Sequence, residues 1–147
     1  MEKFSEAQMI KDCYNKLLKN KSYKEIVLEV PFMSRCIDMV IVDKDNHILS
    51  IEFKLKNIKH ALQQARDHKM GADKSYVCIP KRTKGISKYL AEEFDNYGVG
   101  LFMYDPENDN PFEEVISPKF NNERWEQWEV SLKNLINKIS NKNLFNV

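Results

Sequence analysis

The chain has 147 residues, which suits one domain with a single hydrophobic core. Apolar residues make up 42% and charged residues 31%, a balance typical of soluble globular proteins. No apolar run approaches the roughly 20 residues that span a bilayer. The charged N-terminal segment also lacks the apolar stretch of a signal peptide. These features argue against a membrane protein, and we expect a cytoplasmic location.

The net charge of +1 does not by itself indicate a nucleic-acid-binding protein. Any positive charge that contacts a nucleic acid must therefore be local. Two short clusters of basic residues qualify, namely Lys81, Arg82 and Lys84 in one segment and Lys54, Lys56 and Lys59 in another. Taken alone, each cluster is more simply a solvated surface.

Three cysteines, Cys13, Cys36 and Cys78, lie far apart in the chain and form no CxxC pair. Their odd number and wide spacing argue against a disulfide framework and against a zinc site. We therefore expect each to be a small core residue in a reducing compartment.

Helical and strand periodicities alternate along the first half of the chain. A helix begins at Ser5, a good N-cap residue. Its apolar positions have helical spacing and are Ala7, Ile10, Tyr14, Leu17 and Leu18. Three strands follow, over about 23–30, 36–42 and 48–55. The polar segment 43–47 has the length of a hairpin loop and joins the last two strands.

The second half alternates helices and buried strands. A helix is predicted over about 58–69, with Gly71 placed to end it, followed by a short strand over 75–79. A third helix then ends at Gly98, before a strand over 99–104. After a segment rich in turn-forming residues, an amphipathic helix covers about 122–140. Its apolar stripe consists of Trp125, Trp128, Leu132, Leu135, Ile136 and Ile139.

The resulting order of elements is α-β-β-β-α-β-α-β-α. Three consecutive strands followed by strand–helix alternation imply a mixed sheet, with an antiparallel meander and a parallel half. We therefore expect an α/β protein of one domain over 1–147, with a mixed central sheet flanked by helices. Its core should lie within 5–104.

Acidic and basic side chains occur in two neighbouring strands where apolar residues are expected. Glu52 and Lys54 project from one face of the third strand, whose other face is apolar. Asp38 lies mid-strand in an apolar segment, where an acid is costly to bury unless its charge is compensated. If Val42 pairs with Ile48 across the hairpin loop, Asp38 falls opposite Glu52, with Cβ atoms about 5 Å apart.

Two carboxylates that face each other repel, and each raises the pKa of the other. A divalent cation between them removes this conflict, and Mg²⁺ prefers carboxylate, water and phosphate oxygens. Lys54 would add an ammonium group beside such an ion. Metal and ammonium together suit phosphodiester hydrolysis. The alternative is an ordinary hairpin whose polar face, with Asp38 and Glu52, lies in water; we favour the functional interpretation.

Three further polar residues flank this group. Glu6 falls on the inward side of the first helix and could face a second metal or an attacking water, although a first-turn glutamate is common for its favourable interaction with the helix dipole. Gln64 and His68 lie one turn apart at the edge of the second helix's apolar stripe. Gln64 could bond the carboxylates, the substrate or a neighbouring backbone. The alternative for both, favoured for His68, is the polar rim of an amphipathic helix.

These residues resemble the PD-(D/E)xK nuclease superfamily, which has the restriction-endonuclease-like fold. The matching positions are Glu6, the segment from Arg35 to Asp38, Glu52 with Lys54, and Gln64. Many members carry Gln-x-x-x-Tyr on the helix that holds Gln64, whereas this chain has His68 in place of the tyrosine. The αβββαβ order agrees, and the resemblance covers about residues 5–80.

The resemblance implies hydrolysis of nucleic-acid phosphodiester bonds, usually in DNA, with Mg²⁺ or Mn²⁺. It implies that Asp38, Glu52 and the backbone carbonyl of Phe53 hold the metal. Lys54 would orient the attacking water, and Glu6 would be an auxiliary acid. The expected catalytic set is Asp38, Glu52, Lys54, Glu6 and Gln64, and the expected nucleic-acid contacts are Lys56, Lys81, Arg82 and Lys84.

Two other functions stay open. The chain is short and shows no obvious separate target-reading domain, so it could be a catalytically inactive nuclease-fold module that acts with a partner subunit. It could also be an interaction protein that uses Trp125 and Trp128, although an ordinary core role for these two residues is preferred. Cutting both strands of a duplex usually needs two sites, so a homodimer or a partner subunit is plausible, although nothing in the sequence demonstrates one.

Overall fold

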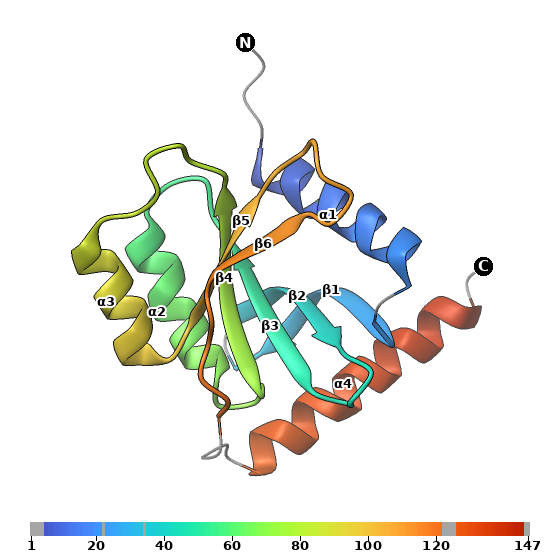
Figure 1. Cartoon of the computed structure of the whole chain (residues 1–147). Coiled ribbons are helices and arrows are strands. Elements are labelled where there is room, and N and C mark those ends of the chain that lie inside the picture. Colours follow the sequence, from blue (N-terminus) through green and yellow to red (C-terminus); the bar gives the residue numbers. More distant parts are fainter. Residues whose placement is uncertain (1–4, 22, 34, 122–125, 146–147) are drawn as a thin grey trace.

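A computed structural model describes residues 5–21, 23–33, 35–121 and 126–145 (Figure 1). The side chains of residues 127, 128 and 140–145 lie outside that description. The elements are, in chain order, α1 (Glu6–Asn20), β1 (Glu25–Phe32), β2 (Arg35–Val42), β3 (Ile48–Phe53), α2 (Ile58–His68), β4 (Lys74–Pro80), α3 (Lys88–Tyr97), β5 (Gly100–Tyr104), β6 (Phe112–Ile116) and α4 (Glu126–Phe145).

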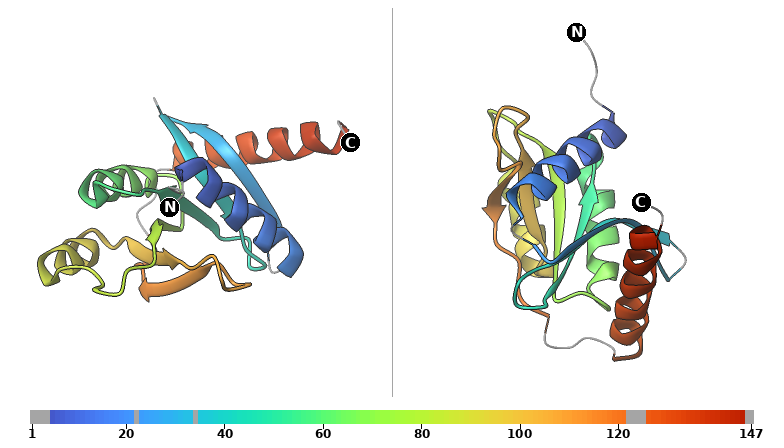
Figure 2. Two further views of the ribbon diagram at one scale, coloured as in Figure 1. Left: turned by 90° about the horizontal axis from the view of Figure 1, so that it is seen from above. Right: turned by 90° about the vertical axis from the view of Figure 1, so that its right-hand side faces the viewer.

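The strands form one sheet in the order β1-β2-β3-β4-β5-β6. The pairs β1–β2, β2–β3 and β5–β6 are antiparallel, whereas β3–β4 and β4–β5 are parallel. Helix α1 packs against one face of the sheet, and α2, α3 and α4 pack against the other (Figure 2). The predicted mixed α/β fold, with an antiparallel meander and a parallel half, is therefore confirmed.

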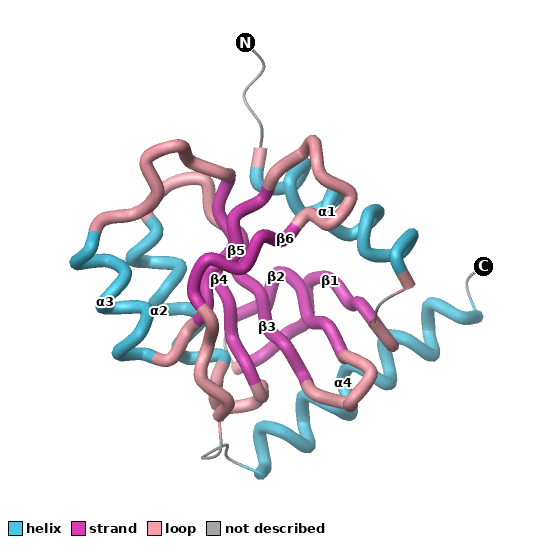
Figure 3. Tube along the Cα trace, in the orientation of Figure 1, coloured by secondary structure: helices cyan, strands magenta, loops and turns pink. Residues whose placement is uncertain are grey.

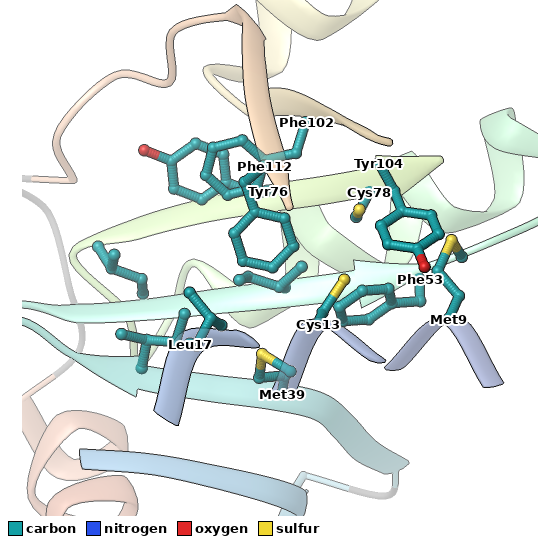
Figure 4. Packing of buried hydrophobic residues seen from close by; sticks show 13 residues of the cluster. Met9, Cys13, Leu17, Met39, Phe53, Tyr76, Cys78, Phe102, Tyr104 and Phe112 are labelled. Atoms are coloured by element: carbon teal, nitrogen blue, oxygen red, sulfur yellow. The ribbon is translucent and has the colours of Figure 1, made fainter. Parts of the chain in front are cut away.

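The face under α1 holds a core rich in aromatic and sulfur-containing side chains (Figure 4). Rings from three adjacent strands stack there: the centroids of Tyr76 and Phe102 lie 4.0 Å apart, and those of Phe102 and Phe112 lie 4.6 Å apart. Such pairs contribute about 0.5–1.5 kcal/mol each beyond the burial of their surface. The stacked rings pack β4, β5 and β6 against one another, in the half of the sheet next to β3.

The opposite face has two apolar clusters. Helix α2 lies over the parallel strands through Ala61, Leu62 and Ala65, and α3 adds Phe94. Helix α4 covers β1 and β2 through Leu132 and Ile136. As a result every residue of β3 is buried, on both faces of the strand.

Several expectations about individual elements are wrong. Strand β6 was not predicted, because Phe112–Ile116 buries only Phe112 fully and carries two adjacent glutamates, so no alternation is visible. On α1 the buried stripe runs through Met9 and Cys13, whereas Ala7 and Leu18 are exposed. Leu18 is one position beyond the buried Leu17, and this step of about 100° turns its side chain into water.

The cysteines are only partly as expected. Cys13 and Cys78 are buried, but Cys36 is exposed near the start of β2. All three thiols are free, in line with the exclusion of a disulfide framework. Trp125 and the side chain of Trp128 fall outside the described part of the chain. None of the described helices has the length and apolar character required to cross a membrane.

Replacing Phe102 by alanine should lower the free energy of unfolding by about 3–5 kcal/mol, because the change removes the middle ring of the stack and leaves a cavity. Urea unfolding measures this loss. Val115→Ala, at a 46% exposed position on the neighbouring β6, is the control and should change stability by less than about 1 kcal/mol. A loss of similar size in both variants would contradict the assignment of the stack as core.

Candidate active site

The β2–β3 hairpin has the predicted register, with Val42 opposite Ile48 and Met39 opposite Ile51. Continuing this register brings Asp38 opposite Glu52. At this level the two side chains bond to the facing strand: the N–H of Phe53 donates to Asp38 Oδ2 at 2.9 Å, and the N–H of Asp38 donates a long bond of 3.4 Å to Glu52 Oε1. The two carboxyl groups therefore lie together and also link the strands.

Strand β1 departs from regular geometry at the same level. Glu29 has a φ of 52° and lies between the pairs Leu28–Met39 and Val30–Ile37, which places it next to Asp38. A residue other than glycine with positive φ is uncommon, and inside a strand it interrupts the regular alternation of side chains. The sheet is thus locally irregular beside the acidic pair.

Glu52 is only 4% exposed. This burial, together with the nearby charge of Asp38, raises the pKa of Glu52 to about 8. Burial also raises the pKa of the half-buried Asp38, while the N–H of Phe53 and the Lys54 ammonium oppose that shift. The Glu52 carboxyl therefore holds a proton at neutral pH. A solvent-exposed polar hairpin face, the alternative weighed from the sequence, does not describe this site.

Glu6 and Lys54 complete the group. The Ser5 side chain accepts the N–H of Gln8 and starts α1, so that the half-buried Glu6 is in the first turn. There Glu6 Oε1 accepts a hydrogen bond of 3.2 Å from the backbone N–H of Leu55, the residue that follows Lys54. The four predicted residues Asp38, Glu52, Lys54 and Glu6 thus come together at the end of β3.

His68 lies inside the site, not on the polar rim of α2 that was expected. The residue is 3% exposed, and its Nδ1 lies 3.2 Å from Glu52 Oε1. Burial lowers the pKa of His68 to about 4, so the imidazole is neutral at pH 7. Its neighbour Gln64 is half-buried and, with His68 and Arg35, lines a pocket of about 180 Å³.

The predicted nucleic-acid contacts lie in loops close to this group. Figure 3 shows the β3–α2, β4–α3 and β5–β6 loops at the same end of the strands, the end at which α1 also begins. Lys56, Arg82 and Lys84 are exposed in these loops. Lys81 is exposed too, but its Nζ lies 3.6 Å from the carboxylates of both Asp105 and Glu113, so its charge is already paired.

A second group of acidic side chains lies at the other end of β3 and was not identified from the sequence. Asp43, Asp45 and His47 in the hairpin loop offer ligand atoms within 4.8 Å of one another, so they could hold a metal ion. In the sequence these residues have the spacing acid-x-acid-x-His, but such polar residues between two strands are also typical of an ordinary turn. Asp43 Oδ1 also accepts the N–H groups of Asp45 and His47, which gives it a structural role in that turn.

No protein-family model and no curated protein sequence matches the chain. A solved structure of a protein of unknown function from Silicibacter pomeroyi is similar over 97% of this chain and 91% of its own length, with 14% identity and a TM-score of 0.66. A repair endonuclease from Pyrococcus abyssi has 20% identity and a TM-score of 0.54, over 72% of this chain. EndoMS, in a complex with double-stranded DNA, has 19% identity and a TM-score of 0.51, over 73% of this chain.

This chain spans about half the length of each of the two endonucleases, 49% and 48% respectively. Its mixed α/β fold, with six strands and four helices in the described residues, is similar to the folds of these endonucleases. The identities are too low to transfer an activity, so the similarity concerns the fold alone.

The buried carboxyl and imidazole make stability depend on pH in a defined way. Glu52, with its pKa raised from 4.5 to about 8, binds more protons when folded, so its contribution falls as the pH rises through that window. His68, with its pKa lowered from 6.5 to about 4, binds fewer protons when folded, so its contribution to the free energy of unfolding rises with pH up to about 6.5. Of these two groups, only Glu52 changes the free energy of unfolding between about pH 6.5 and 8, and it lowers that free energy as the pH rises.

The free energy of unfolding of the wild type, measured in urea with EDTA, should therefore fall between about pH 6.5 and 8. Glu52→Gln should remove this slope, because an amide has no proton to lose. Glu92→Gln, at an exposed position on α3, should keep the wild-type slope. Parallel curves for the wild type and Glu52→Gln across this window would show that Glu52 is not the titrating group.

Proposed function

We propose that this chain is a metal-dependent nuclease of the PD-(D/E)xK type that hydrolyses phosphodiester bonds, with DNA as the expected substrate. The observation that carries the proposal is the meeting of Asp38, Glu52 and Lys54 at the end of β3, with Glu52 buried. Two carboxyl groups forced together, one of them nearly inaccessible, are unfavourable unless a proton or a cation lies between them. The repair endonuclease and EndoMS support the proposal through their similar folds.

The donor set fits a divalent cation. Asp38 and Glu52 supply carboxylate oxygens, and the carbonyl of Phe53 adjoins them in β3, so these three would hold Mg²⁺ or Mn²⁺. When bound, such an ion lowers the pKa of a coordinated water and offsets the charge of a phosphate. The Glu52 proton would have to leave as the cation binds, because the two compete for the same oxygens.

The remaining residues would orient water and phosphate. Lys54 is half-buried beside the carboxyl groups, where its ammonium would orient the attacking water or stabilise developing negative charge. Glu6 is held to the backbone after Lys54 and would serve as an auxiliary acid. Gln64 lines the same pocket as His68 and would contact the substrate or the carboxyl groups.

The surrounding loops would bind the nucleic-acid backbone. Lys56, Arg82 and Lys84 are exposed at the same edge as the site and suit phosphate contacts, which give affinity without sequence specificity. Lys81 would contribute only by giving up its two carboxylate partners. Cutting both strands of a duplex would require a second site, which a homodimer or a partner subunit could supply.

Lys54→Ala should lower metal-dependent cleavage by about 100- to 1000-fold, the usual cost of losing one group that stabilises charge in the transition state. The substrates are linear, branched and single-stranded DNAs and RNA, each incubated with Mg²⁺, Mn²⁺ or EDTA. The matched control is Lys44→Ala, an exposed lysine in the hairpin loop at the far end of β3, which should cleave normally.

Thermal melts of both variants should match the wild type. Cleavage that survives in Lys54→Ala, or that persists in EDTA, would refute the proposal. A folded wild type that binds DNA and metal but cleaves none of these substrates would identify the alternative, an inactive nuclease-fold binding module.

Metal binding separates the two acidic groups of the structure. Calorimetric titration with Mn²⁺ should show a binding event in the wild type that is lost in Asp38→Asn. Asp43→Asn, which alters the hairpin-loop group, should leave that event in place. Loss of the event in Asp43→Asn alone would move the ion to the hairpin loop and away from the proposed site.

A further inference from the structure

The imidazole of His68 has a feature that the proposed function does not use. The residue is 3% exposed, and Nδ1 receives no hydrogen bond from the other described residues. A buried polar atom without a partner costs free energy, so such atoms in a folded protein call for a physical explanation. Nδ1 lies 3.2 Å from Oε1 of Glu52, a carboxyl group assigned to metal binding, so without a metal only the Glu52 proton could link these two atoms.

This separation matches that of two ligands on one metal ion. Bonds from a divalent ion to imidazole nitrogen and carboxylate oxygen are about 2.0–2.2 Å long, so two adjacent ligand atoms lie about 3 Å apart. A neutral imidazole offers its lone pair to a metal. The imidazole also meets the ring of Phe32 edge-on, at a centroid distance of 6.1 Å.

A pocket borders the imidazole of His68. The pocket of about 180 Å³ between the β1–β2 hairpin and α2 is lined by His68, Gln64 and the charged side chains of Arg35 and Asp67. The positive charge of Arg35 disfavours a cation near His68, and the negative charge of Asp67 favours one. Because these two charges act in opposite directions, we expect the carboxyl groups of Glu52 and Asp38 to make the site attractive to a cation.

We propose that His68 Nδ1 is a ligand to the metal ion held by Glu52, and that this nitrogen makes the site select a first-row transition ion over Mg²⁺. Mg²⁺ takes oxygen ligands almost without exception, whereas the affinity of nitrogen-containing sites rises from Mn²⁺ through Co²⁺. The inference rests on the proposed function, which supplies the ion. It adds a residue outside the predicted ligand set and narrows the class of cofactor.

Pulsed electron paramagnetic resonance on Mn²⁺-loaded protein tests the ligand directly, because a bound imidazole modulates the manganese signal through its nitrogen. The chain has three histidines, and His47 belongs to the hairpin-loop group, so the measurement uses the full chain carrying His47→Gln. We expect a ¹⁴N modulation that is replaced by the ¹⁵N pattern when the protein is grown with ¹⁵N-histidine. It should disappear in His47→Gln/His68→Asn and persist in His47→Gln/His60→Asn.

The amide oxygen of His68→Asn would take the place of Nδ1. This variant should lower the Co²⁺ affinity at least about tenfold, by the scale of losses seen when metal-site residues are changed, and should leave Mg²⁺ affinity within about threefold. If the variant does not fold, the isotope exchange in His47→Gln/His60→Asn decides alone, because His68 is then the last histidine of the chain. Mn²⁺ binding at Asp38 and Glu52 without any nitrogen modulation would overturn the inference and leave the proposed function intact. Failure of Mn²⁺ to bind there at all would defeat both.

Discussion

The burial of Glu52 beside Asp38 is the constraint on which the site depends. Two carboxyl groups in a poorly solvated position cannot both be charged without a large cost, so a proton or a cation must accompany them. The fold does not relieve this conflict by exposing either group. Instead it supplies partial compensation, through the N–H of Phe53 to Asp38, a long bond from the N–H of Asp38 to Glu52, and the Lys54 ammonium. The result is a site with a built-in preference for a bound positive charge.

The architecture explains why this group is buried and why it still reaches solvent. Strand β3 lies at the junction of the antiparallel and parallel halves of the sheet and is covered by helices on both faces. Its final residues lie at the edge where α1 begins and where three loops gather (Figure 3). The other acidic group, Asp43 with Asp45 and His47, lies in a hairpin turn at the opposite end of the same strand. There the carboxylates are not forced together by burial, and hydrogen bonds within the turn account for Asp43.

Much of this arrangement followed from the sequence because it rests on local rules. Alternation in β2 and β3, together with the length of the 43–47 loop, was enough to predict the register that sets Asp38 opposite Glu52. Helical spacing was enough to turn Glu6 toward the end of β3. These predictions needed only the periodicity of one element and the geometry of one hairpin.

Features that depend on several distant elements could not be predicted in this way. His68 appears on a helical wheel as a rim residue, and its burial next to Glu52 involves residues distant in sequence, among them Phe32 at the end of β1. Strand β6 shows no alternation because its stability comes from pairing with β5 and from Phe112 in the aromatic stack. Cys36, near the start of β2, was expected in the core, but it lies beside Arg35 at an exposed position.

The central claim is that a divalent ion replaces the proton that the Glu52 carboxyl holds beside Asp38. Counting the protons released on Mn²⁺ binding tests it most directly, by calorimetry at pH 7 in buffers of different ionisation enthalpy. The account predicts release of close to one proton by the wild type and almost none by Glu52→Gln. Binding of Mn²⁺ with no proton release from the wild type would contradict it, because the ion would then lie somewhere other than between these two carboxyl groups.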